Sequence, residues 1–237
     1  MSVQDLILEL RAKSDPERAK LLQRYFKTGK GEYAEGDVFL GITVPEQRKI
    51  AKKHWEKTDL NEIQELLSSK VHEYRFLALL ILCEKYKKLK KDKQKQHEIF
   101  EFYLKNTKNI NNWDLVDLSA PSIVGDFSIR DGPHVIRFLA KSNNLWEKRI
   151  AILATFAFIK KRDFGESLFI ADTLMNDEND LIHKAVGWML REVGKKNSEV
   201  LELFLSTRYK KMPRTMLRYA IEKFPEEKRK KYLKGEI

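Results

Sequence analysis

Residues 75–80, Arg-Phe-Leu-Ala-Leu-Leu, set the pattern that decides the fold: a basic residue leads a run of small and apolar ones. Related stretches are residues 149–154 (RIAILA) and 184–190 (KAVGWML). Arg75, Trp113, Arg149 and Trp188 follow one another at intervals of 38, 36 and 39 residues. Such intervals are typical of HEAT-type arrays, in which one helix pair forms each unit and the period is roughly 40 residues. We therefore expect an α-solenoid of HEAT-like helical repeats, whose inner helices line a concave basic face and carry these four positions in a row.

Residues that typically begin and end helices occur along the rest of the chain and support an all-α fold. Gly (10) and Pro (6) are scarce, and no run alternates cleanly as a half-buried strand would. Asp15 followed by Pro16 is typical of an N-cap with proline at the first helical position. Residues 28–43 contain four glycines and predict a loop. Helices are expected at 3–13, 16–27, 44–55, from an Asp59 or Asn61 cap to about Ser68, and at 73–87, 91–105, 111–124, 133–141, 145–161, 164–175, 180–194, 198–206, 213–224 and 226–233.

The charge balance favours a polyanionic partner. The 237 residues include 46 Lys+Arg and 35 Asp+Glu, which gives a net charge of +11 and a pI of about 9.5. Nucleic acid is the first candidate partner and an anionic membrane surface the second, although a merely soluble basic protein could have the same composition. With 42% hydrophobic residues the chain can bury a sizeable core, and we expect a single HEAT-like repeat domain over residues 1–237.

The cellular location is inferred from cysteine usage and from the lack of apolar segments. The single cysteine, Cys83, rules out a disulfide within the chain, which fits a reducing compartment. The N-terminal residues lack the apolar run of a signal peptide, and no window approaches the roughly 20 apolar residues of a membrane span. We expect an intracellular protein, cytoplasmic and nucleoid-associated, that does not bind a membrane and is a monomer.

Several kinds of catalytic site are disfavoured by the motifs. The five histidines are dispersed, none pairs with another at helical spacing, and no cysteine cluster exists, so a metal site is not expected. Residues 29–36 resemble a phosphate-binding loop only superficially, because they lack the Gly-Lys-Ser/Thr ending and follow no strand. No Gly-x-Ser-x-Gly elbow occurs. No cofactor is predicted.

Trp113 and Asp117 form the most informative pair. They stand four residues apart in a predicted helix, so that their side chains share one face. The neighbours of Asp117 are apolar, and carboxylates are almost never fully buried without a partner. Asp117 therefore pairs with Arg149 of the next unit, or lines a cleft, or does both. A purely structural ion pair explains the sequence equally well.

Trp188 and Tyr25 are weaker candidates. Trp188 is by itself more simply a core aromatic, since aromatic side chains dominate protein cores. Gly187 before it is unexpected in the middle of a helix and indicates a close backbone approach. Trp113 follows two asparagines at a helix start, where partial exposure is as plausible as burial.

Five stretches, in order, resemble the AlkD family of alkylpurine DNA glycosylases. The resemblance runs from about Leu6 to Phe224, and five ordered motifs make it specific. The matching stretches are residues 24–27, 36–48, 113–117 (Trp-x-x-x-Asp), 146–149 (Trp-x-x-Arg) and 184–192.

The resemblance implies a HEAT-like solenoid that clasps duplex DNA and excises cationic N3- and N7-alkylated purines without a metal or cofactor, and without flipping the lesion into a pocket. Asp117 takes the role of the family's catalytic carboxylate. Trp113 and Trp188 match aromatic residues that contact the lesioned nucleotide, Arg149 an arginine on the DNA backbone, and Tyr25 a tyrosine of the cleft.

That chemistry suits a modest site. The glycosidic bond of an alkylated purine is already weakened, so a carboxylate that stabilises the oxocarbenium-like sugar and orients water suffices. Water as nucleophile predicts a monofunctional enzyme that leaves an abasic site. The alternatives are a HEAT-like scaffold for protein partners, and a nucleic-acid-binding repeat protein without catalysis.

Basic residues elsewhere are expected to hold double-stranded DNA through its phosphates. The lysine run at residues 85–95 is better explained as a solvated linker than as a DNA contact. The predicted DNA-binding set is Tyr25, Arg149, Lys184, Arg191, Arg208, Lys210, Lys211, Arg214 and Arg218.

Overall fold

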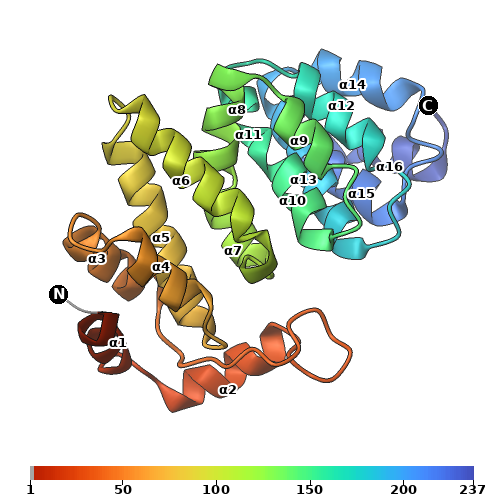
Figure 1. Ribbon diagram of the computed structural model, residues 1–237. Helices are drawn as coiled ribbons and strands as arrows, with labels where there is room; N and C mark the ends of the chain where they lie inside the picture. Colours follow the sequence, from red (N-terminus) through yellow and green to blue (C-terminus); the bar gives the residue numbers. More distant parts are fainter. Residues whose placement is uncertain (1–2) are drawn as a thin grey trace. The chain divides into compact units, whose positions relative to one another are not determined.

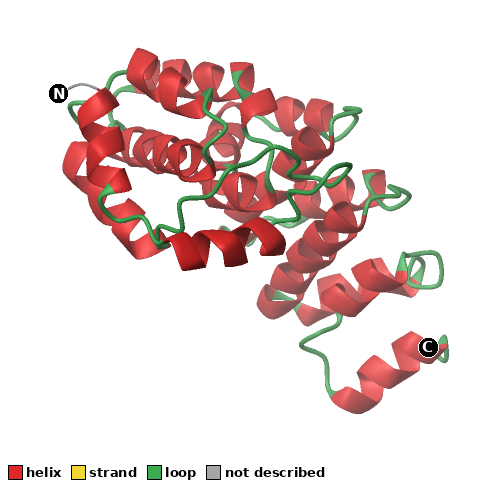
Figure 2. Cartoon of the chain, turned by 90° about the horizontal axis from the view of Figure 1, so that it is seen from below, coloured by secondary structure: helices red, strands yellow, loops and turns green. Residues whose placement is uncertain are grey.

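The computed structural model describes residues 3–237, and over these residues every regular element is a helix (Figures 1 and 2). The nearest approach to a strand is one isolated parallel bridge between Val38 and Val71. The chain divides into two compact units at Ser119/Ala120. Unit 1 ends at Ser119, and unit 2 begins at Ala120. The all-α prediction is confirmed, whereas the prediction of a single domain stays a prediction.

Unit 1 is built around one buried helix. Its elements are α1 (Val3–Arg11), α2 (Pro16–Tyr25), α3 (Val44–His54), α4 (Leu60–Leu67), α5 (His72–Lys88), α6 (Lys93–Lys105), the 3₁₀-helix η1 (Thr107–Asn109) and α7 (Trp113–Ser119). Helix α5 packs against α3, α4, α6 and α7 (Figure 1). Its run from Phe76 to Leu82 is buried all round, as expected for a central helix.

The helix starts in unit 1 follow the caps read from the sequence. Asp15 accepts a hydrogen bond from the N–H of Arg18 at 3.0 Å, and Pro16 is the first helical residue of α2. Asp59, rather than Asn61, caps α4 in a reciprocal capping box with Glu62. Helix α2 buries none of its residues, so caps and loop contacts hold it in place more than a core does.

The long connection from α2 to α3 is a loop, as predicted, and a buried carboxylate anchors its end. Glu73, only 2% exposed, accepts hydrogen bonds from the N–H groups of Leu40 (3.0 Å) and Gly41 (2.8 Å). Gly41 has φ of +81°, and a Cβ there would lie 2.1 Å from the carbonyl oxygen of Asp15. Only glycine fits both the backbone conformation and this close approach.

Unit 2 repeats the arrangement of helices stacked side by side. Its elements are the π-helical turn η2 (Pro121–Gly125), α8 (Asp126–Asp131), α9 (His134–Leu139), α10 (Leu145–Ala154), α11 (Phe156–Lys160), α12 (Gly165–Thr173), α13 (Asp180–Lys196), α14 (Ser198–Ser206), α15 (Arg214–Ala220) and α16 (Glu226–Lys234). Helix α13 packs against α10, α12, α14 and α15. Paired helices on a shared core are what a HEAT-like repeat predicts.

Two predicted helices are split. The expected 111–124 helix ends at Ser119 and is followed by η2, where the N–H of Gly125 bonds to the carbonyl of Ala120, five residues back. Pro121 has no N–H to continue the α-helical ladder, which explains the break. The expected 145–161 helix is interrupted at Thr155, whose N–H bonds three residues back to Ile152. Helix α8 was not expected.

One expectation about the repeat is wrong. Arg75 does not line an open face, because it is 4% exposed and pairs with Asp37 inside unit 1. The repeat-leading positions do lie on packed helices, with Arg75 on α5, Arg149 on α10 and Trp188 on α13. The periodicity therefore located the central helices correctly, but not the side to which each leading residue points.

Candidate active site

The start of α7 fixes the candidate pair. Asn112 is fully buried, its side-chain oxygen accepts the N–H of Trp113 at 2.8 Å, and its carbonyl accepts the N–H of Val116. Helix α7 then carries Trp113 and Asp117 one turn apart on one face. Both residues are half-buried. As a residue, Asp117 is thus only partly buried, whereas its neighbours Leu115 and Val116 are fully buried.

A column of rings supports the indole of Trp113. Phe26 stacks on Trp113 at a centroid distance of 5.1 Å and an interplanar angle of 10°. Phe39 stacks on Phe26 at 4.9 Å, and His72 stacks on Phe39 at 4.5 Å. Each such pair contributes roughly 0.5–1.5 kcal/mol beyond the area it buries. Because His72 also lies 5.1 Å from Phe26, the column widens behind Phe26 into a triangle of three rings, and Trp113 is its partly exposed end.

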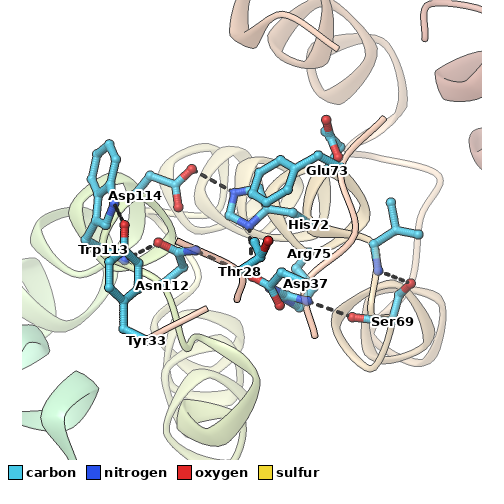
Figure 3. Close-up of polar contacts among 12 residues, drawn as sticks. Thr28, Tyr33, Asp37, Ser69, His72, Glu73, Arg75, Asn112, Trp113 and Asp114 are labelled. Atoms are coloured by element: carbon cyan, nitrogen blue, oxygen red, sulfur yellow. Dashed lines mark hydrogen bonds and ion pairs between the residues drawn. The ribbon is translucent and has the colours of Figure 1, made fainter. Parts of the chain in front are cut away.

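Two tyrosines meet the edges of this column. Tyr25, the last residue of α2, is 65% exposed and stands edge-on to Trp113 at 6.1 Å. Tyr33, on the loop after α2, accepts a hydrogen bond from the indole Nε1–H of Trp113 at 3.2 Å (Figure 3). Tyr25 thus lies beside Trp113, its expected place in a cleft stays a prediction, and Tyr33 is an addition that the motifs did not indicate.

A buried charge cluster shares His72 with this column of rings (Figure 3). Asp37 binds Arg75 Nη2 at 2.7 Å and lies 3.6 Å from Nδ1 of His72. The opposite ring nitrogen, His72 Nε2, is 2.8 Å from Asp114 Oδ2. Asn112 Nδ2 lies 3.4 Å from the same oxygen of Asp37. Asn112 and Asp114 flank Trp113 in sequence, so the cluster fixes both sides of the first turn of α7.

The cluster sets the protonation of its members. Burial lowers the pKa of His72, but the Asp114 and Asp37 carboxylates outweigh it, and the net pKa is raised. Burial raises the pKa of Asp37, but His72 and Arg75 outweigh it, and the net pKa is lowered. When His72 is protonated, it and Arg75 balance the charges of Asp37 and Asp114, which is how buried charges are tolerated.

The remaining catalytic candidates belong to unit 2. Arg149 is 5% exposed, and its Nη1 donates to the carbonyl of Leu181 at 2.7 Å. Trp188 is half-buried, and its Nε1 donates to Glu192 at 3.1 Å. Trp188 is thus not the fully buried core residue that was the simpler interpretation. The expected pairing of Asp117 with Arg149 stays a prediction.

Gly187 does mark a close backbone approach, as its position in the middle of α13 predicted. A Cβ at this residue would lie 2.5 Å from the carbonyl oxygen of Met216 and 2.5 Å from Cβ of Tyr219. No real side chain tolerates such distances to backbone. The contact lets α13 and α15 pack closely beside Trp188.

The predicted DNA-contact residues of unit 2 differ in how their charges are used. Lys184 pairs with Asp180 at 2.7 Å, Arg208 with Asp172 at 2.6 Å, and Arg191 with Glu222. The others are exposed: Lys210 over the ring of Tyr209, Arg214 bonded to the carbonyl of Leu233, Lys211 and Arg218. In unit 1 the lysine run spans the turn from α5 to α6.

Residues 3–237 contain neither a metal-binding cluster nor a membrane-spanning helix. In this part of the chain no three His, Cys, Asp or Glu side chains gather in a group that could hold a metal ion. No helix there is both long and apolar enough to span a bilayer.

Most of the residues that pack against Trp113 or fix its position were not identified from the sequence. Phe26 and Phe39 lie in matching stretches but were not singled out, and His72 was seen only as one dispersed histidine. The available signal was a tryptophan flanked by two polar residues, Asn112 and Asp114, at the start of a helix. Their partners, Asp37 and His72, are 75 and 42 residues away, and sequence alone cannot pair them.

Comparisons with known proteins agree with this fold. The model of a family described as DNA alkylation repair enzyme matches residues 6–224. A solved structure described as a predicted DNA alkylation repair enzyme from Enterococcus faecalis has a TM-score of 0.72 at 19% identity, covering 90% of this chain and 98% of that one. AlkD2 from Streptococcus mutans has a TM-score of 0.56 at 19% identity, covering 89% and 99%.

A third solved structure, smu.31 from Streptococcus mutans UA159, has a TM-score of 0.58 at 21% identity and covers 76% of this chain and 92% of that one. A search of curated proteins finds no match. The solved structures show a shared helical-repeat fold, and the family model spans nearly the whole chain. The protein belongs to the DNA alkylation repair enzyme family, which confirms the resemblance read from the five motifs.

Proposed function

We propose that the protein is a monofunctional DNA glycosylase that hydrolyses the N-glycosidic bond of cationic N3- and N7-alkylated purines in duplex DNA. The observation that carries the proposal is α7, where a partly exposed indole and a half-buried carboxylate share one face. Membership of the DNA alkylation repair family supports the choice of substrate.

Asp117 stabilises the sugar as the base leaves. The alkylated base departs neutral, and positive charge develops at C1′ of the deoxyribose. A carboxylate held beside that carbon stabilises the charge and orients or deprotonates the attacking water. One preorganised group of this kind typically contributes about a hundred- to a thousandfold in rate. No nucleophile or lyase lysine is needed.

The aromatic and basic residues hold the nucleotide in place. Trp113 and Trp188 pack against the sugar of the lesion, and each indole face favours nearby positive charge by on the order of 1–2 kcal/mol when water is excluded. Tyr25, Lys184, Arg191 and the basic residues from Arg208 to Arg218 contact phosphates, and Arg149, which is 5% exposed and bonded to the carbonyl of Leu181, has to change its side-chain contacts to do the same. Such contacts are independent of sequence and weaken steeply with salt.

The decisive experiment follows base release from duplex DNA containing N7-methylguanine. Asp117→Ala and Asp117→Asn are compared with the wild type under single-turnover conditions. We expect release to fall at least about a hundredfold in both variants, because each removes the negative charge at the reacting sugar. DNA affinity, measured separately, is expected to change little.

Glu65→Ala is the matched control, since Glu65 is an exposed carboxylate on α4 of the same unit. It should leave release unchanged. Undiminished release by Asp117→Asn would remove Asp117 from its role. DNA binding without any release by the wild type would instead favour a non-catalytic DNA-binding protein, and the absence of DNA binding at low salt would favour a protein scaffold.

A further inference from the structure

The loop between α2 and α3 is folded by its own turns. Lys27, Gly31 and Gly36 have φ values of +53°, +78° and +83°. Two of the three are glycines, which adopt positive φ without strain. The carboxylate of Glu32 accepts the N–H of Gly29 at 2.7 Å inside the first turn. The path of residues 27–36 is thus set by local backbone geometry and side-chain caps.

Contacts within the loop and with Gln23 of α2 hold the same loop in place. Ala34 is 3% exposed, and its N–H donates to the carbonyl of Lys27 at 3.3 Å. Gln23 of α2 donates from Nε2 to the carbonyl of Asp37 at 2.6 Å and accepts from the N–H of Phe39 at 3.3 Å. Tyr33 is held next to buried Ala34, on a segment with little freedom to move.

The hydroxyl of Tyr33 meets the one polar atom of the Trp113 indole. Trp113 Nε1–H donates to Tyr33 Oη at 3.2 Å (Figure 3). Burial raises the pKa of Tyr33, even though the hydrogen bond from Trp113 lowers it, so the hydroxyl stays protonated at neutral pH. The contact therefore joins two neutral groups and does not change with pH in the physiological range.

Stacking alone does not fix how the indole is turned. Phe26 offers Trp113 an apolar face at 10° to the indole plane, and an indole flipped by about 180° about its Cβ–Cγ bond keeps the same parallel arrangement. The last torsion of a tryptophan side chain is also broad and roughly two-fold. The bond to Tyr33 selects one orientation, with the nitrogen edge toward the loop and the six-membered ring away from it (Figure 3).

We propose that Tyr33 is a positioning residue of the active site: the loop after α2 uses its hydroxyl to fix the rotation of the Trp113 indole, and so the surface that this indole presents to the sugar of the lesion. The inference rests on the proposed function for its effect on catalysis. The contact itself is independent of that function. The loop of residues 27–38 thereby becomes part of the site.

Two measurements test the role. Proton–nitrogen correlation spectra of nitrogen-15-labelled protein should show one indole N–H signal for each of the four tryptophans, and Trp113→Phe identifies the signal of Trp113 by its loss. Tyr33→Phe keeps the ring and removes only the hydroxyl. We expect it to move the Trp113 signal and to slow single-turnover release of N7-methylguanine about three- to tenfold, with DNA affinity unchanged, as loss of one neutral hydrogen bond predicts.

Tyr74→Phe is the matched control. Tyr74 accepts a hydrogen bond from Arg11 Nε at 2.6 Å, between α5 and α1 of the same unit. Tyr74→Phe removes the same hydroxyl group, and with it a hydrogen bond accepted from an N–H donor, without touching Trp113. It should move none of the indole signals and leave release unchanged, whatever it does to stability.

The Trp113→Phe background makes the coupling testable. Phenylalanine has no N–H to donate, so adding Tyr33→Phe to Trp113→Phe should slow release no further. Equal slowing in both backgrounds, an unmoved Trp113 signal, or slowing that comes only from weaker DNA binding would overturn the role. If the wild type releases no base, the proposed function fails and the role in catalysis fails with it, while the spectra still report whether the contact exists.

Discussion

The spacing of the repeat groups Trp113 with Trp188, yet the protein holds them differently: Trp113 begins α7, and Trp188 lies in the middle of α13. Trp113 ends a column of stacked rings over a buried charge cluster, and its Nε1–H is bound by a tyrosine from a distant loop. Trp188 donates to Glu192, one turn along its own helix, and the ring of Phe156 lies tilted to it at 6.5 Å. One indole is fixed by tertiary contacts and the other mostly by its own helix.

The difference shows which of the two indoles is held in place before a ligand binds. A side chain held by several elements keeps its geometry when a ligand arrives, because each contact restricts a different torsion. A side chain held by a neighbour on the same helix can change rotamer without disturbing the core. We infer that Trp113 is a rigid wall and that Trp188 adapts. Three experiments can break or sharpen this comparison.

The largest expected effect is on the charge cluster beneath Trp113. Arg75→Ala leaves the carboxylate of Asp37, buried at 5% exposure, without its closest ion-pair partner. Breaking a buried pair in this way typically costs about 3–5 kcal/mol. We expect a loss of that order in the free energy of unfolding, measured by urea titration. Adding Asp37→Asn should recover part of it, and a loss under about 1 kcal/mol for Arg75→Ala would show that the cluster does not brace the column.

A smaller effect is expected beside Trp188. Gly187→Ala places a Cβ 2.5 Å from the backbone oxygen of Met216, which cannot move aside cheaply. Overpacking costs about 1–3 kcal/mol, and the helix gains roughly 0.5–1 kcal/mol from alanine, so a net loss on the order of 1–2 kcal/mol follows. Thermal unfolding measures it. Gly165→Ala is the control, because its nearest contact would be Asp163 Oδ1 at 3.7 Å, and a neutral or stabilising result is expected there.

The smallest effect is a pH dependence confined to the support of Trp113. The pKa of His72 is raised in the folded protein, so its contribution to stability is present below its unfolded value of about 6.5 and is lost as pH rises through the folded value. The pKa of Asp37 is lowered, so its contribution is present above 3.8 and is lost as pH falls through the folded value.

His72→Asn tests the upper limit of this window. The groups that face His72 are the carboxylates of Asp37 and Asp114 and the guanidinium of Arg75. The stability gap between wild type and variant, measured by urea unfolding, should be larger at pH 5.5 than at pH 8.5. A gap that is constant over this range would mean that the pKa of His72 is the same in the folded and unfolded protein, and a gap that is smaller at pH 5.5 would mean that His72 stays neutral in the folded protein.

Much of the fold could be predicted from the sequence, because it depends on interactions between residues that are close together in the chain. The caps Asp15 and Asp59, the proline at the start of α2 and the break at Pro121 act within one or two turns of the chain, so residue order specifies them. Repeat spacing found the central helices because each unit buries a similar apolar face. Trp113 and Asp117 were readable for the same reason, since helical spacing alone puts them on one face.

By itself, then, the sequence determined an all-helical repeat protein, the family to which it belongs, and a tryptophan and a carboxylate one turn apart. Only the tertiary structure decided that Arg75 points inward, that Phe26 and Phe39 stack behind Trp113, and that Tyr33 binds its nitrogen. The physical reason is range: hydrogen bonds along one helix follow from spacing, whereas a ring column or a buried ion pair needs segments that are dozens of residues apart to be brought together by the burial of a common core.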